Sequence, residues 1–180
     1  FRDSLDPPLW TSFPNSKYNK LNRFMKKLNS VYEKDPTKAP KIVFIMEGTF
    51  HGNDVYVNIN YPVNINYPLM MIGAGRNKTF LGGYTLHIGG TKEEGKEVVV
   101  QDMTSSRAEY GLHAYNGLSF LCKDMTFTQC RYSGVYASNN TKGRLNNCVI
   151  TQCRGNGICC GRNALIELKG DQTKVDGNGT

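Results

Sequence analysis

The chain has 180 residues, of which 39% are hydrophobic and 19 are glycine, and a formal net charge of +7. This length fits one domain with its own core, and so many glycines indicate frequent turns rather than long helices. No run approaches the ~18 apolar residues that would cross a bilayer, so the sequence excludes a transmembrane segment. The composition therefore predicts a soluble protein, and it does not identify a compartment.

Residues 1–40 differ from the rest of the chain and carry most of the excess positive charge. Apolar residues recur at helical spacing within 14–34, with Asn15 or Ser16 as a candidate N-cap. Prolines make the preceding segment extended or irregular. We expect 1–40 to form an extended segment and an amphipathic helix that caps the fold. The basic face of this helix is either solvated or meets an acidic partner.

Residues 41–90 contain short strand patterns separated by glycine turns. KIVFIMEGTF (41–50) indicates a strand that ends at a turn, and 70–90 indicates further strands and turns. Between them, VNINYP occurs twice in succession over 57–68. Proline cannot donate to a strand ladder, so this duplication predicts an edge strand or a corner.

Two later stretches nearly repeat each other: DMTFTQCRYSGVYA from Asp124 and NCVITQCRGNGICC from Asn147. Within each, apolar residues alternate as they do in short strands with one buried face. A step of 22 or 23 residues generates five apolar columns: Leu112, Val135 and Ile158; Ala114, Ala137 and Cys160; Met103, Met125 and Cys148; Phe120, Gly143 and Ile166; and Cys122, Leu145 and Leu168. Such self-similarity is typical of stacked architectures.

These observations predict an all-β fold, a right-handed parallel β-helix of about six coils over 41–180, with the N-terminal helix as its cap. The pattern resembles the pectate-lyase-like superfamily. Its TQC…GV coils are similar to those of β-helix proteins from algae and large algal viruses. The resemblance implies the fold and leaves residues 1–40 unexplained.

The predicted β-helix has no cap after KVDGNGT at its C-terminal end. An uncapped coil exposes strand edges and an apolar cross-section, which stacked arrays normally cover. We therefore expect either a protein partner at this end or flank, or a longer polypeptide.

The six cysteines lie between residues 122 and 160, and four of them are expected to face inward or to stack: Cys130, Cys153, Cys148 and Cys160. Three interpretations are open: free structural thiols, one disulfide, or metal ligands. Free thiols are the favoured one, with no metal or cofactor, and would suit a reducing compartment.

Outward-facing columns supply the candidate sites. Asp102 and Asp124, continued by Asn147, could share Ca²⁺ or a proton for acid catalysis, or could simply form turns. His113 and Tyr136 share a column with Cys159, and neighbouring tyrosines could stack on sugar rings. Arg131 and Arg154 could bind an acidic saccharide or another anion.

The favoured function is a non-catalytic structural or interaction module within a larger assembly. The alternative is a carbohydrate-active enzyme or a binder of anionic polysaccharide, acting through Asp102, Asp124, Arg131 and Arg154. The enzyme motifs that the resemblance would imply, including calcium-binding aspartates with a catalytic arginine, do not occur. IGAGRNKT (72–79) lacks the spacing of a phosphate loop, so no nucleotide is predicted.

Overall fold

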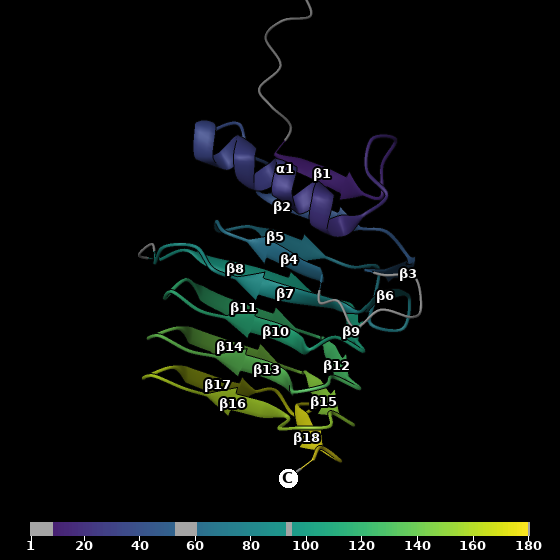
Figure 1. Cartoon of the computed structure of the whole chain (residues 1–180), viewed down its shortest axis with the longest axis vertical. Coiled ribbons are helices and arrows are strands. Elements are labelled where there is room, and N and C mark those ends of the chain that lie inside the picture. The colour runs from purple at the N-terminus through teal and green to yellow at the C-terminus, as the bar shows by residue number, and fades with distance from the viewer. Residues whose placement is uncertain (1–8, 53–60, 93–94, 180) are drawn as a thin grey trace, which may run out of the picture.

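The computed structural model describes residues 9–52, 61–92 and 95–179, which form a parallel β-solenoid of about five turns with one helix near its N-terminus. Each turn supplies one strand to each of three sheets, and all strand pairs are parallel (Figure 1). Because every strand between the ends of a sheet is hydrogen-bonded to the turns above and below it, the backbone is satisfied through the middle of the stack.

Three sheets form the walls of the solenoid. The seven-stranded sheet contains, in spatial order, β1 (Trp10–Phe13), β2 (Ile42–Ile45), β5 (Met70–Ile72), β8 (Glu97–Gln101), β11 (Ser119–Lys123), β14 (Lys142–Asn146) and β17 (Leu165–Lys169). The five-stranded sheet contains β4 (Tyr61–Ile65), β7 (Tyr84–Ile88), β10 (Tyr110–Ala114), β13 (Ser133–Ala137) and β16 (Ile158–Cys160). The six-stranded sheet contains β3 (Gly48–His51), β6 (Thr79–Gly82), β9 (Thr104–Ser106), β12 (Thr126–Thr128), β15 (Val149–Thr151) and β18 (Lys174–Asp176).

The predicted columns are confirmed by the strand registers. Leu112 pairs with Val135, which in turn pairs with Ile158. Cys122, Leu145 and Leu168 are aligned in the same way in the seven-stranded sheet. Their inward side chains fill the lumen, and the inner residues of the middle turns are fully buried. The core is therefore a set of vertical files of side chains, one turn above the next.

The solenoid has about five turns rather than the expected six, because the early turns are longer. Arg144 pairs with Leu121, a step of 23 residues, whereas Val99 pairs with Met70, a step of 29. The longer early turns include the connection through Gly89 and Gly90. Extrapolating the regular C-terminal step back to residue 41 therefore overestimated the number of turns.

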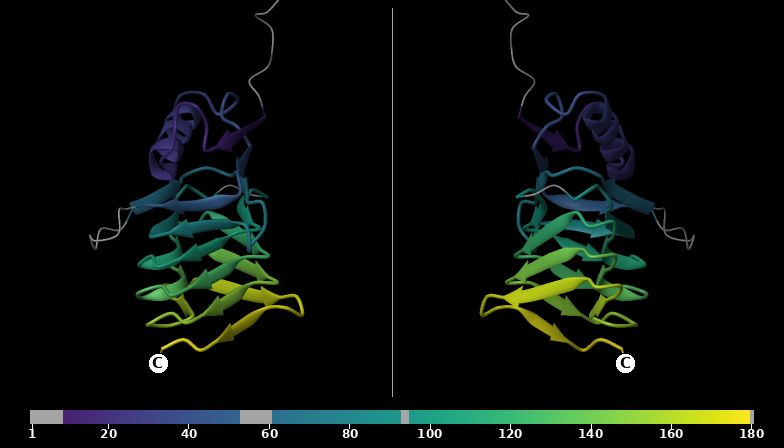
Figure 2. Two further views of the ribbon diagram at one scale, coloured as in Figure 1. Left: turned by 90° about the vertical axis from the view of Figure 1, so that its right-hand side faces the viewer. Right: turned by 90° about the vertical axis from the view of Figure 1, so that its left-hand side faces the viewer.

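Helix α1 (Leu21–Lys34) lies across the N-terminal end of the stack (Figures 1 and 2). It buries Leu21, Phe24, Met25 and Leu28 against the first turn. Buried Asn29 donates its Nδ2 to the carbonyl of Asn64 (2.9 Å) and accepts from the backbone of Asn66 (3.3 Å). The helix thus covers the lumen and also satisfies backbone groups beside the edge strand β4.

Two details of the N-terminal region differ from the sequence expectation. The N-cap residue of α1 is Lys20 and makes no side-chain capping bond, so the predicted Asn15 or Ser16 cap is wrong. The Asn15 side chain instead accepts from the backbone of Lys17 and Tyr18 in a turn. In addition, β1 pairs with β2, so residues on both sides of the expected boundary at 40 share one sheet.

The duplicated hexapeptide contributes an edge strand, as predicted for the part that is described. Its second half begins within β4, which contains Pro62 and lies at the end of the five-stranded sheet. Residues 57–60 of the duplication, and residues 1–8 of the predicted extended segment, lie outside the described residues.

Candidate functional site

The Asp102, Asp124 and Asn147 column forms one corner of the solenoid. All three residues have a left-handed backbone, with φ of 59°, 50° and 53°. Asp102 accepts a hydrogen bond from Gln101 Nε2 (2.8 Å), and Asn147 Oδ1 accepts one from the backbone of Gln172 (3.4 Å). Asp and Asn tolerate this conformation better than most residues, so the bend by itself accounts for their presence.

The Thr-Gln-Cys-Arg repeats form a second corner. Gln129 and Gln152 have φ of 56°, and Arg107, one turn earlier, has φ of 55° and donates to Gln129 Oε1 (3.0 Å). The repeated cysteine then points inward and the repeated arginine outward. Arg131 and Arg154 are both exposed, and the Arg131 guanidinium lies 5.4 Å from the centre of the Tyr132 ring.

The six cysteines are free, and four of them are fully or almost fully buried in the lumen: Cys122, Cys130, Cys148 and Cys153. Burial raises the pKa of Cys148 to about 11 and that of Cys122 well above its ordinary value. The adjacent Cys153 thiol, together with burial, also raises the pKa of Cys130. Since the thiolate is the reactive form, Cys122, Cys130 and Cys148 act as apolar fillers, whereas the hydrogen bond with Cys130 lowers the pKa of Cys153.

The outward face of the five-stranded sheet carries a ladder of histidine and tyrosine rings. His87 pairs with His113, which pairs with Tyr136, which pairs with Cys159. The rings of His113 and Tyr136 are stacked (centroids 4.9 Å apart), as are those of Tyr110 and Tyr136 (5.6 Å). The faces of Tyr110, His113 and Tyr136 thus partly cover one another, whereas His87 meets His113 edge to face.

His87 belongs to this ladder and was missed by sequence analysis. It precedes its partner His113 by 26 residues, which breaks the spacing seen in later turns. The only available signal was its strand pattern, YTLHI, which matches YGLHA in β10. Among the described residues, no hydrogen-bond partner reaches the buried Nε2 of His87. Burial, and then the neighbouring His113, lower the pKa of His87 to about 4; burial also lowers that of His113.

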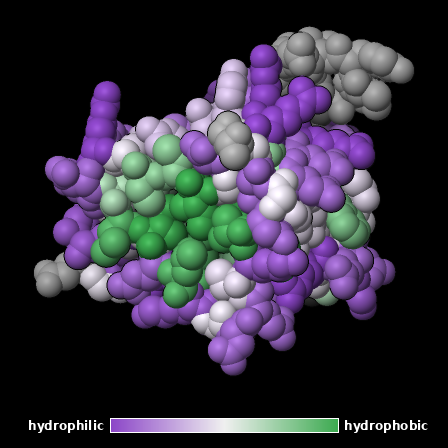
Figure 3. Space-filling model, turned by 90° about the horizontal axis from the view of Figure 1, so that it is seen from below, coloured by the Kyte–Doolittle hydropathy of each residue, from purple (hydrophilic) through white to green (hydrophobic). Residues whose placement is uncertain are grey.

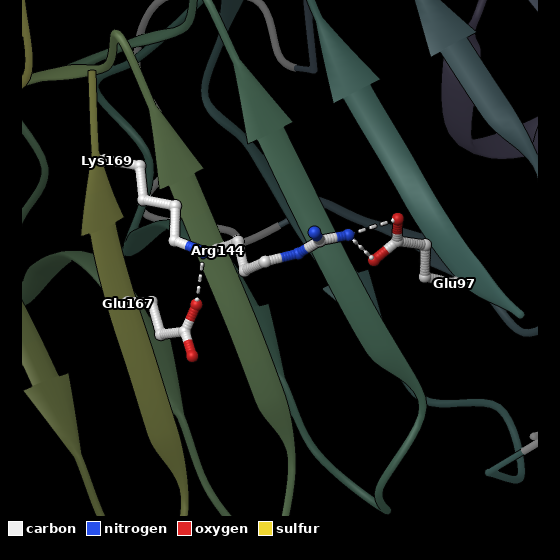
Figure 4. Close-up of polar contacts among 4 residues, drawn as sticks. All are labelled: Glu97, Arg144, Glu167 and Lys169. Carbon is white, nitrogen blue, oxygen red and sulfur yellow. Dashed lines mark hydrogen bonds and ion pairs between the residues drawn. The ribbon is translucent and has the colours of Figure 1, made fainter. Parts of the chain in front are cut away.

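The outward face of the seven-stranded sheet is charged in its C-terminal half (Figure 4). Arg144 Nη2 contacts both carboxylate oxygens of Glu97 (2.7 and 2.8 Å), two strands away, and Lys169 pairs with Glu167 (3.0 Å). Glu97, Arg144 and Glu167 border a groove of about 420 Å³ that also includes Lys92 and Lys142. The pairs are largely exposed, so they contribute little to stability and orient each other on the surface.

The C-terminal end of the solenoid exposes an apolar cross-section (Figure 3). Leu168 is 52% exposed, whereas Leu145, one turn earlier in the same column, is 0% exposed. Val175 is 40% exposed, whereas Ile150 above it is 0% exposed. Cys160, expected to face inward under Ala137, does so at this end and is therefore exposed.

Within the described residues, the fold and these surfaces define a parallel β-solenoid whose first turn is covered by α1 and whose last turn is left open. No family model matches the chain, and no curated protein or solved structure matches it. In the described part of the chain no helix has the length and apolar character needed to cross a membrane. The same residues contain no group of three or more His, Cys, Asp or Glu arranged to hold a metal ion.

Proposed function

We propose that the chain is a non-catalytic docking module, a rigid β-solenoid that joins a larger assembly through its open C-terminal end. One observation carries this proposal: residues of one column change from fully buried to about half exposed in the last turn. An apolar patch next to unpaired strand edges is typical of a surface that another β-layer covers. Strand addition would supply both the backbone bonds and the apolar contacts.

The other surfaces support a structural role. The aspartate column is explained by a bend, four inward thiols are buried, and the stacked rings of Tyr110, His113 and Tyr136 partly cover one another's faces. The basic N-terminal segment and the flank remain further contact surfaces within this proposal. The proposal also includes the resemblance to pectate-lyase-like proteins and to algal and viral β-helix proteins. The regular C-terminal turns support that resemblance.

Binding of an anionic polysaccharide is the second candidate. It is favoured by the flank formed by exposed Tyr132, Arg131 and Arg154, where two cations and an exposed aromatic ring lie together. Equilibrium binding to pectins, alginates and sulfated glycans would separate this candidate from a docking role.

The docking role is tested by photo-crosslinking in cells that make the protein. A p-benzoylphenylalanine replacing Leu168 should give one discrete covalent product, because this side chain lies on the open end. The matched control replaces Leu165, which lies on the same strand and is also 52% exposed, but points outward. The Leu165 position should give little product, and Val175→Lys should abolish the product formed from position 168. Equal products from both positions, or none from position 168, would contradict the proposal.

A further inference from the structure

The last turn, made by β16, β17 and β18, is electrically balanced within a chain of net charge +7. Residues 158–179 carry three cationic and three anionic side chains: Arg162, Lys169, Lys174, Glu167, Asp171 and Asp176. A balanced surface with an apolar centre can meet its own copy without the repulsion that the rest of the molecule would impose.

The free edge of β17 exposes backbone groups at alternate residues. Leu165 donates its N–H to Thr141 (3.0 Å), and the carbonyl of Lys169 accepts from Asn147 (3.1 Å), so both point toward the preceding turn. Backbone groups alternate in direction along a strand, so those of Ile166 and Leu168 point toward the free edge. The last turn can therefore accept another strand.

At the opposite end of the solenoid β1 keeps a free edge, because among the described strands it pairs with β2 alone. Helix α1 lies over the lumen at that end, with its Leu21 and Met25 fully buried and its Asn29 bonded to the edge strand β4. Head-to-tail stacking of copies would place the apolar last turn against the exposed side of α1, which carries Arg23, Lys26 and Lys27. Like ends match better, and they give the closed, twofold arrangement of most homodimers.

A twofold axis perpendicular to the solenoid axis also matches the lengths of the three strands. Such an axis reverses strand direction, so the two last turns meet antiparallel. When it passes through the wall formed by β17, it places β17 against itself and pairs each of the other two walls of one copy with the other wall of its partner. Those two walls end in β16 and β18, which have three residues each, whereas β17 has five.

We propose that a second copy of this chain covers the open end in a tail-to-tail dimer, with β17 antiparallel to β17 and Leu168 on the twofold axis. This register places Glu167 of each copy beside Lys169 of the other and buries Leu168 against its equivalent. Centring on Glu167 would instead oppose two carboxylates. The inference rests on the proposed function, because it names the partner that the docking surface receives.

Sedimentation velocity of the whole chain over a range of concentrations tests the dimer. The parent should form dimers and no larger species. Leu168→Lys places two ammonium groups at the axis and should weaken the dimer by about a hundredfold or more. The Leu165→Lys control changes the same residue type at the same exposure and should leave the dimer intact. Circular dichroism would establish that both variants keep the β fold.

The register is tested by charge exchange. Glu167→Lys alone, or Lys169→Glu alone, makes both cross-copy pairs alike in charge and should weaken the dimer by about tenfold or more. An equal mixture of the two variants should restore a heterodimer, because both cross-copy pairs are then opposite. Within each variant chain the side chains at 167 and 169 still have the same charge. Recovery of the dimer in the mixture therefore comes from the pairs between copies and not from pairs within one chain.

The outcomes separate this inference from the proposed function. A monomer at all concentrations, or a mixture that does not recover, overturns the twofold dimer. If photo-crosslinking from position 168 then gives a product with another protein, the docking role stands, and that protein rather than a second copy is the partner at the last turn. A dimer that ignores Leu168→Lys overturns both.

Discussion

Each regular turn of the solenoid bends at residues with a left-handed backbone. Asp102, Asp124 and Asn147 occupy one corner, and Gln129 and Gln152 another. This conformation costs an ordinary L-residue roughly 1–2 kcal/mol, and the short polar side chains of Asp and Asn lower that cost. The bend was one of the interpretations open from sequence. The glutamine corner was not foreseen, because Gln has no such preference.

At the same scale, His87 should make stability depend on pH. Its neutral ring is packed against His113 and Tyr115, with Nε2 buried. Burial lowers its pKa to about 4, from about 6.5 in the unfolded chain. The folded state therefore favours neutral His87, and this contribution is complete above about pH 6.5 and lost as the pH falls toward 4.

We expect the free energy of unfolding, measured by urea denaturation, to fall between about pH 7 and pH 4. His87→Phe should reduce that fall, because phenylalanine keeps a ring in the ladder and cannot take up a proton. Parallel pH profiles for the parent and the variant would show that His87 is not protonated in this window.

At the scale of elements, α1 acts as a cap through both its apolar face and Asn29. The periodicity of residues 14–34 predicted the helix, although its first turn begins at Leu21, after the turn made by Asn15. The role of Asn29 was not visible in sequence, since a polar residue on a helix is usually solvated. Its side chain instead pairs with backbone groups of Asn64 and Asn66.

Asn29→Leu should therefore destabilise the fold by about 1–3 kcal/mol, although leucine is the better helix former. The loss comes from a buried carbonyl and N–H left without partners. The matched control is Asn22→Leu, on the same helix, where the side chain bonds only to the adjacent backbone. Chemical denaturation should place the control at or above the stability of the parent. Equal losses in both variants would argue against edge capping.

At the scale of the whole molecule, stability is distributed along one dimension. The strand ladders join each turn only to its neighbours, so a middle turn has two stabilising backbone interfaces and the last turn has one. Local opening should accordingly be easiest at the C-terminal end.

Amide hydrogen exchange should be slowest in β10, β11 and β12 and fastest in β16, β17 and β18. Raising the protein concentration should slow exchange in the last turn selectively if copies cover it there. Uniform exchange along the stack would contradict the one-dimensional description.

The sequence by itself determined the strand pattern and the inner columns from Leu112 to Leu168, because side chains alternate between two faces at every second residue. This rule is local and holds wherever the turns keep one length. Only the tertiary structure decided which residues meet where turn lengths vary. It brought His87 under His113, joined Glu97 to Arg144 across an intervening strand, and placed β1 beside β2.

Burial in the last turn was also decided by tertiary structure. Leu145 and Leu168 have the same inward pattern, yet one is sealed and the other is open. The physical reason is that an inward side chain is buried only when a turn lies on both sides of it. A periodic sequence specifies whether a side chain points inward or outward. Whether that side chain is buried depends on the presence of a neighbouring turn.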